Sequence, residues 1–384
     1  MPFWSRRPPE EPPSWEELLP LEALLRSQLD DVLIVQERRL LGRSIAFGGR
    51  LLVKPAAALE RLRPRLASHG YTPFIREDQG VVWVHAIAQA EAVEPSRPLV
   101  HLGLFLATVL TTLLAGAIEQ GVAPAEFLSD PSRILAGVPF SVTLIAILGV
   151  HEFGHYSVGR YHGMPVSLPF FIPVPPVPPF LLGTLGAVIR LRGAIRDRRA
   201  LFDMAIAGPL AGLLIAIPAY VVGIARSRVV PVAELADRAS GELFLGPSLL
   251  SVLLHRLVLG PISADGAAIE LHPVGVAAWF GFFVTALNLI PAGQLDGGHI
   301  VYAMFGVRHA LISKLAVGLL ILIGLAFGSI NWLVWAALIV GLMGFQHTPT
   351  MDDITPLDGR RRLLGLFALI LLLLLLPPVP LSPR

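Results

Sequence analysis

The sequence predicts a polytopic α-helical membrane protein with about seven transmembrane helices, a small N-terminal α+β soluble domain and a re-entrant Pro-rich hairpin. Of its 384 residues, 54% are hydrophobic and only 15% are charged, whereas a soluble domain carries about 25% charged residues. Several apolar runs reach about 18 residues, the length that marks a candidate membrane span. These runs begin after residue 97, which we take as the boundary between the soluble and membrane parts.

Residues 1–20 are rich in Pro and Glu and are expected to form a loose arm, followed by a soluble α+β module over residues 21–97. In this module we expect two strands, a helix with Pro near its start and Gly at its end, and a closing hairpin. The expected elements cover residues 31–36, 44–53, 55–70, 71–77 and 80–87. The module contains no cluster of catalytic side chains, so we expect a regulatory or docking role.

Residues 98–384 are expected to form the membrane domain. The predicted spans cover residues 99–118, 134–160, 204–225, 271–290, 309–328, 331–345 and 363–381. The formal net charge is only +2, so no basic field indicates a nucleic-acid partner. The chain has no cysteine, which excludes disulfides and thiolate metal sites.

The second predicted span ends in GVHEFGHYSVGR, residues 149–160. His151 and His155 are four residues apart and share one helix face, so both imidazoles could bind one metal ion. Glu152 follows the first histidine and could accept a proton from water at that ion. Zinc suits nitrogen ligands, and catalytic zinc needs three protein ligands and one open position. Ionisable residues inside a span are costly and indicate function, which favours a metal site over a chance pattern.

Three aspartates after Glu152 are candidates for the third ligand. Asp197 lies in an arginine-rich loop, where ion pairing explains it, and Asp203 could complement a helix dipole at the start of the third span. Asp296 lies in NLIPAGQLDGGH, directly after residues 271–295, which contain no Asp, Glu, Lys or Arg. A break in a helix at membrane depth is tolerated where the broken segment lines a cavity or is buried in protein. A simple turn would explain Asp-Gly alone, but not the adjacent intramembrane Asn288.

The two motifs HEFGH and NLIPAGQLDGGH resemble those of the site-2 protease family of intramembrane zinc metalloproteases. LPFFIPVPP and GTLGAVIRLRG further resemble the subgroup of plant chloroplast members and their bacterial relatives. The resemblance implies that Zn²⁺ is bound by His151, His155 and Asp296. It implies that Glu152 is the catalytic base and that Asn288 helps to hold the substrate backbone or the oxyanion. The implied reaction is hydrolysis of peptide bonds in or near the transmembrane segments of membrane proteins.

Residues 166–191 contain too many prolines for a regular helix and end in a strand-like run. We expect a re-entrant hairpin there. Its edge could pair with an unwound substrate by β-augmentation, or the hairpin could be a structural plug at the membrane surface; both interpretations stay open.

The expected partners are membrane-protein substrates and the lipid bilayer. Arginines gather in the loops that follow the second span and precede the last one, which predicts that these loops and the N-terminal module are cytoplasmic. The expected location is the inner membrane of a bacterium. A metal-binding transporter and a non-proteolytic regulatory homologue are the alternatives. The convergence of the ligands on one catalytic pattern, with Glu152 present, favours the protease.

Overall fold

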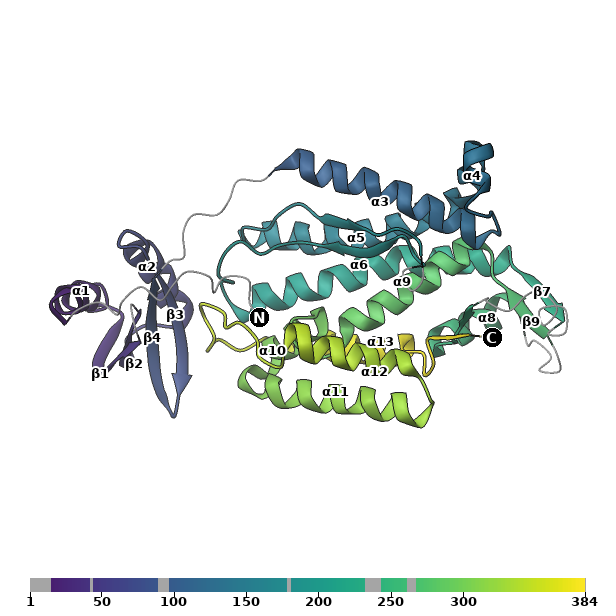
Figure 1. Ribbon diagram of the computed structural model, residues 1–384. Coiled ribbons are helices and arrows are strands. Elements are labelled where there is room, and N and C mark those ends of the chain that lie inside the picture. The colour runs from purple at the N-terminus through teal and green to yellow at the C-terminus, as the bar shows by residue number, and fades with distance from the viewer. Residues whose placement is uncertain are drawn as a thin grey trace.

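The computed structural model describes residues 15–41, 44–88, 97–177, 181–231, 243–260 and 267–383. A small sheet-containing module lies at one end of an elongated bundle of helices (Figure 1). Residues 1–14 of the predicted arm lie outside the described residues. The remainder of that prediction is wrong, because helix α1 (Trp15–Ser27) begins inside the arm.

The N-terminal module has the predicted strands and helix. Its elements are β1 (Leu33–Leu41), β2 (Ser44–Leu51), α2 (Pro55–Ala67), β3 (Tyr71–Asp78) and β4 (Val81–Ala88). The strands form one antiparallel sheet in the order β1-β2-β4-β3. Alternate residues of a strand face the same side, and here Phe47 and Val84 pack with Leu62 and Leu66 of α2 in one buried core.

The bundle begins directly after Arg97. Its helices are α3 (Pro98–Glu119), α4 (Glu126–Ser129), α5 (Val138–Tyr161), α6 (Arg198–Ala225), α8 (Leu249–Leu259), α9 (Pro273–Leu289), α10 (Asp296–Phe305), α11 (His309–Ala326), α12 (Ile330–Leu338) and α13 (Gly359–Leu375). Short 3-10 turns precede α5 (Pro131–Gly137) and α11 (Gly306–Arg308), and a π turn (Ile339–Met343) follows α12.

Four helical stretches among the described residues are long and apolar enough to cross a membrane, which is consistent with a membrane protein. They are Pro98–Glu119, Pro131–Tyr161, Arg198–Ala225 and Asp296–Ala326. The predicted number of seven spans is not confirmed. The expected fourth and sixth spans are the shorter helices Pro273–Leu289 and Ile330–Met343, and the expected fifth span extends back to Asp296.

Helix α6 lies at the centre of the bundle and packs against both α5 and α9. Glycines permit this close approach, as small residues do in membrane helices. A Cβ on Gly154 of α5 would lie 2.7 Å from the carbonyl oxygen of Ala207 in α6, and one on Gly223 of α6 would lie 2.3 Å from Gly275 Cα in α9.

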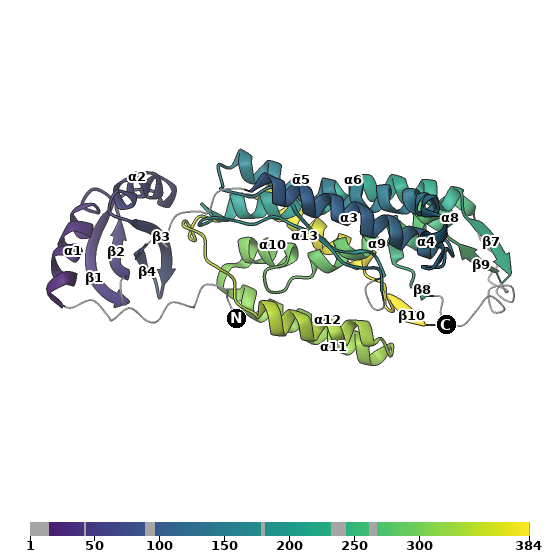
Figure 2. The ribbon, with the colours of Figure 1, turned by 45° about the horizontal axis from the view of Figure 1, so that its top comes forward.

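The Pro-rich segment forms a β-hairpin, and its re-entrant position in the membrane stays a prediction. Strand β5 (Phe170–Pro173) pairs antiparallel with β6 (Thr184–Val188), and a bridge between Val166 and Leu191 extends the pairing; residues 178–180 lie outside the described residues. Two further strand pairs, β7 (Arg228–Pro231) with β9 (Ala267–Glu270) and β8 (Leu243–Leu245) with β10 (Leu381–Pro383), lie at the end of the bundle remote from the module (Figure 2).

Candidate metal centre

Helices α5 and α10 bring the three predicted ligands together. The Nε2 atoms of His151 and His155 lie 3.1 Å apart, and Asp296 Oδ2 lies 3.3 Å from each of them. The histidines are one helical turn apart on α5. Asp296 reaches them because the chain breaks after α9 and α10 begins at this aspartate. The three residues form a group that could hold a metal ion.

The donor atoms fit a tetrahedral ion. Ligand bonds of about 2.0 Å in a tetrahedron place the ligand atoms about 3.3 Å apart, close to the separations found here. Asp296 Oδ2 is buried and has no hydrogen-bond partner among the described residues, a costly state for a carboxylate that lacks a cation. The Nδ1–H of His155 donates to the Met204 carbonyl at 2.7 Å, which leaves Nε2 unprotonated and available to a metal.

Two glycines of α6 leave room for the imidazoles. A Cβ on Gly208 would lie 2.1 Å from His155 Nε2, and one on Gly212 would lie 3.2 Å from His151 Nδ1. The glycines have the same four-residue spacing as the histidines that they face. The sequence signal was GPLAG, which indicates close helix packing but not that the packing partner is the pair of ligands.

We therefore expect Gly208→Ala to weaken metal binding by about tenfold or more, because the new methyl group would displace a ligand ring from its position. The measurement is Zn²⁺ affinity by chelator competition. Gly318→Ala on α11 is the matched control, since no atom of the described residues beyond its chain neighbours and its own helix backbone lies within 4 Å of its added Cβ. Equal affinities of the two variants would contradict this role of Gly208.

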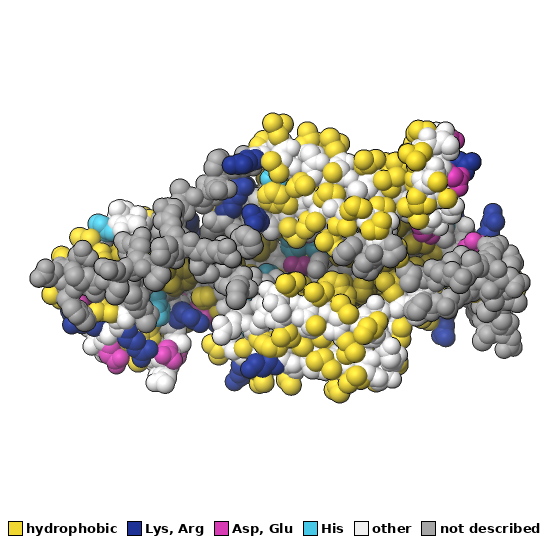
Figure 3. Space-filling model, in the orientation of Figure 1, with side chains coloured by type: hydrophobic (Ala, Val, Ile, Leu, Met, Phe, Trp, Pro, Cys, Tyr) yellow, Lys and Arg dark blue, Asp and Glu magenta, His cyan; other side chains and the backbone are white. Residues whose placement is uncertain are grey.

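The ligands open onto a cleft of about 1030 Å³. Histidine and acidic side chains are visible at the bottom of a groove between two apolar bodies (Figure 3). Glu152 lines the cleft and is only 7% exposed, and Ile189, just after β6, lines the same cleft. The amide of Asn288 reaches the same place, with Nδ2 3.3 Å from His151 Nε2. All five predicted site residues thus meet at one cleft.

The other two aspartates have different roles. Asp203 lies in the second turn of α6 and binds Arg361 of α13, with Oδ–N distances of 2.7 and 2.6 Å, and His162 at 3.0 Å. The dipole role predicted for Asp203 therefore stays a prediction, whereas the structure shows the carboxylate paired with Arg361 and His162, which lie far away in sequence. Asp197 caps α6 by accepting from the backbone N–H groups of Arg199 and Ala200, in addition to an ion pair with Arg196.

Comparison with known proteins shows that the chain is similar to metalloproteases. The model of peptidase family M50 matches residues 139–330, which is half of the chain. "Probable zinc metalloprotease EGY2, chloroplastic" of Arabidopsis thaliana is 29% identical over 88% of this chain and 60% of its own length. "Probable zinc metallopeptidase EGY3, chloroplastic" from the same plant is 30% identical over 75% of this chain and 51% of its own length.

The chain thus spans about 60% of the length of such a relative. No solved structure matches it. The matched region contains both sequence motifs and all three candidate ligands, and the relatives are of the plant type that the Pro-rich segment indicated. The chain belongs to peptidase family M50, the site-2 protease family.

Proposed function

We propose that the protein is an intramembrane zinc metalloendopeptidase that hydrolyses peptide bonds in or near the transmembrane segments of membrane proteins. The observation that carries the proposal is the convergence of His151, His155 and Asp296 beside Glu152 in one cleft. The printed names of the relatives, probable zinc metalloproteases, support zinc as the metal. Family membership supports membrane-embedded proteins as the substrates.

His151, His155 and Asp296 would hold the zinc ion, which acidifies a water molecule and polarises the carbonyl of the scissile bond when it is bound. Glu152 accepts a proton from the attacking water as the new C–O bond forms. It then delivers this proton to the amide nitrogen as the C–N bond breaks, so that a carboxylic acid and an amine are released. The amide of Asn288 orients the substrate backbone or stabilises the developing oxyanion.

The hairpin is the part of the chain that would hold the substrate. Residues 187–192, which include the end of β6, line the cleft together with Glu152. A transmembrane helix hides its amides in internal hydrogen bonds, so a substrate must unwind before attack. An unwound segment could satisfy its amides by pairing with the edge of β6, which is β-augmentation.

Removal of the metal tests the proposed reaction. We expect the purified protein to cleave a panel of single-span membrane proteins, to lose this activity in a strong chelator and to regain it with added Zn²⁺. Gel electrophoresis and mass spectrometry of the products would give the cleavage sites. The panel should include membrane proteins that accumulate in a Glu152→Gln strain. If the protein retains zinc but cleaves none of these substrates, a transporter or a regulatory homologue would be favoured.

We also propose seven spans in a bacterial inner membrane, with the N-terminal module and the arginine-rich loops in the cytoplasm. The module lies at the end of the bundle where α3 and α6 begin, and β7 and β9 lie at the other end (Figure 1). Arg196 of the arginine-rich loop binds Glu60 of the module at 2.8 Å, which supports a common side. Reporters that are active only in the cytoplasm should therefore be active when fused after Arg97 and after Arg199. A periplasm-only reporter active at either site would overturn this orientation.

A further inference from the structure

A short segment between the π turn and α13 connects the N-terminal module to the bundle. We name residues 350–355 the docking segment. Its backbone lies between β3 and the chain before α6: Ile75 donates to the Met351 carbonyl at 2.7 Å, and the Met351 N–H donates to the Ile195 carbonyl at 2.8 Å. The Met351 side chain, 3% exposed, is part of the buried core of the module. The β3 edge of the sheet is thus covered by a segment from the bundle, through an isolated parallel bridge between Ile75 and Asp352.

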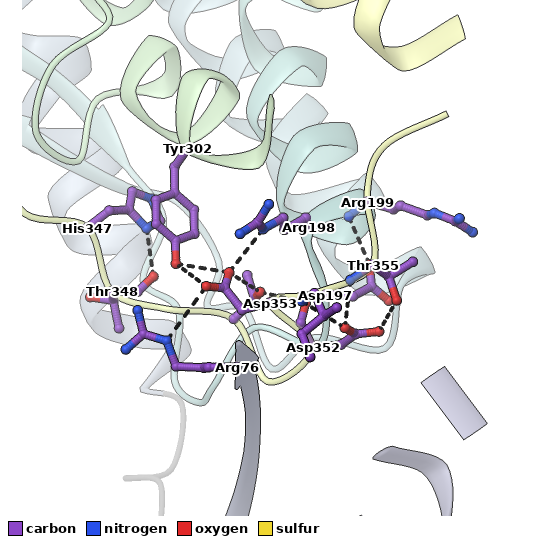
Figure 4. A network of polar contacts seen from close by, with 12 residues as sticks. Arg76, Asp197, Arg198, Arg199, Tyr302, His347, Thr348, Asp352, Asp353 and Thr355 are labelled. Atoms are coloured by element: carbon purple, nitrogen blue, oxygen red, sulfur yellow. Dashed lines mark hydrogen bonds and ion pairs between the residues drawn. The ribbon is translucent and has the colours of Figure 1, made fainter. Parts of the chain in front are cut away.

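The carboxylate of Asp353 in this segment is buried and contacts side chains from three other parts of the chain (Figure 4). Tyr302 Oη of α10 donates to both carboxylate oxygens at 2.9 Å. Arg198 Nε of α6 donates at 3.1 Å, and Arg76 Nε of β3 forms a longer ion pair at 3.7 Å. A carboxylate is costly to bury without such partners. The arrangement of Asp353 therefore depends on α6, α10 and the docked module together.

The contacts of Asp353 lead to the helix that carries the third ligand. Tyr302 is six residues after Asp296 on α10, about 9 Å along the axis. The ring of Tyr302 stacks on His347 with 4.1 Å between centroids, and His347 Nε2 accepts a hydrogen bond from His299 Nδ1–H at 2.6 Å. Burial lowers the pKa of His347 to about 3, so the ring is neutral in this contact. Two side chains of α10, those of Tyr302 and His299, are thus held by residues 347–353.

We propose that Asp353 is a positioning residue for the metal ligand Asp296, and that docking of the N-terminal module stabilises this position. The docking segment takes its conformation from pairing with β3, and its buried carboxylate fixes Tyr302 and hence the rotation and depth of α10. Release of the module would loosen α10 and move Asp296 relative to the histidines of α5. The inference rests on the proposed metal function and adds to it a control of the metal site by the soluble module.

The test uses the full-length protein in detergent, loaded with Co²⁺ in place of zinc, because the visible absorption of Co²⁺ reports its coordination geometry. Asp353→Asn keeps the size of the side chain and removes its charge, and Tyr302→Phe removes only the hydroxyl. We expect both variants to change the Co²⁺ spectrum and to weaken its binding by roughly tenfold, the low end of the range for groups outside the ligand shell. Asp352→Asn is the matched control, because the Asp352 carboxylate accepts, among the described residues, from Ile354 and Thr355 within the docking segment.

Substitutions of Met351 in the docking segment test whether docking of the module affects the metal site. Met351→Asp would place a charge in the core of the module and release it, whereas Met351→Leu conserves volume and should keep it docked. We expect Met351→Asp to change the Co²⁺ spectrum as Asp353→Asn does, and Met351→Leu to leave it unchanged. If Tyr302→Phe and Met351→Asp both show the Co²⁺ spectrum and the Co²⁺ affinity of the wild-type protein, this inference is wrong and the proposed metal function still stands. Failure of the wild-type protein to bind Co²⁺ or Zn²⁺ would overturn the proposed metal function and this inference with it.

Discussion

Glu152→Gln should abolish peptide hydrolysis and leave the metal content unchanged. The substitution preserves the shape of the side chain and both neighbouring histidines, but an amide cannot accept the proton that the attacking water must lose. We expect the cleavage rate to fall by about 10²–10⁴-fold, the contribution of a positioned general base. The measurements are product formation from a transmembrane substrate and zinc per protein by elemental analysis.

The zinc measurement separates this role from a structural one. Glu152 is 7% exposed and lies next to a ligand in sequence, so a distorted site would lose zinc as well as activity. Full zinc occupancy without cleavage identifies Glu152 as the base. Substantial turnover by the purified variant would sink that assignment, and a parallel loss of zinc and activity would show that the residue supports the ligands.

Asp296→Ala should lower zinc affinity and activity together. The three candidate ligand atoms lie 3.1–3.3 Å apart, and the substitution removes one of them. The two remaining histidines are too few, because a catalytic zinc site needs three protein ligands. Because loss of an outer partner alone costs about 10–100-fold in metal affinity, loss of this ligand should cost more than about 100-fold. Chelator competition measures the affinity, and the cleavage assay follows the activity.

Asp203→Ala is the control for this experiment. Asp203 lies on the neighbouring helix α6, but its carboxylate is held by Arg361 and His162. We expect this variant to retain zinc even if loss of the ion pair lowers thermal stability. The reverse result, with zinc lost in Asp203→Ala and kept in Asp296→Ala, would mean that the wrong carboxylate has been assigned.

Local patterns explain why much of this protein could be predicted. In the N-terminal module, the alternation of apolar and polar residues predicts the strands, and Pro near the start and Gly at the end predict the helix. The length of the apolar runs predicts the membrane character. The spacing of His151 and His155 fixes their common helix face, because the geometry of a helix is the same wherever it forms. The resemblance to a known family then selected Asp296 from several aspartates, a choice that composition and spacing alone did not force.

Other features were decided only by tertiary structure. Asp203 pairs with Arg361, which is 158 residues away, and Gly208 lies against His155 because α6 packs on that face of α5. Met351 belongs to the core of a module that lies more than 250 residues earlier in the chain. Such contacts depend on which helix faces meet, and sequence periodicity identifies an apolar face without identifying the partner that covers it. The sequence by itself therefore determined the residue types of the candidate site, and packing determined which distant residues lie against that site.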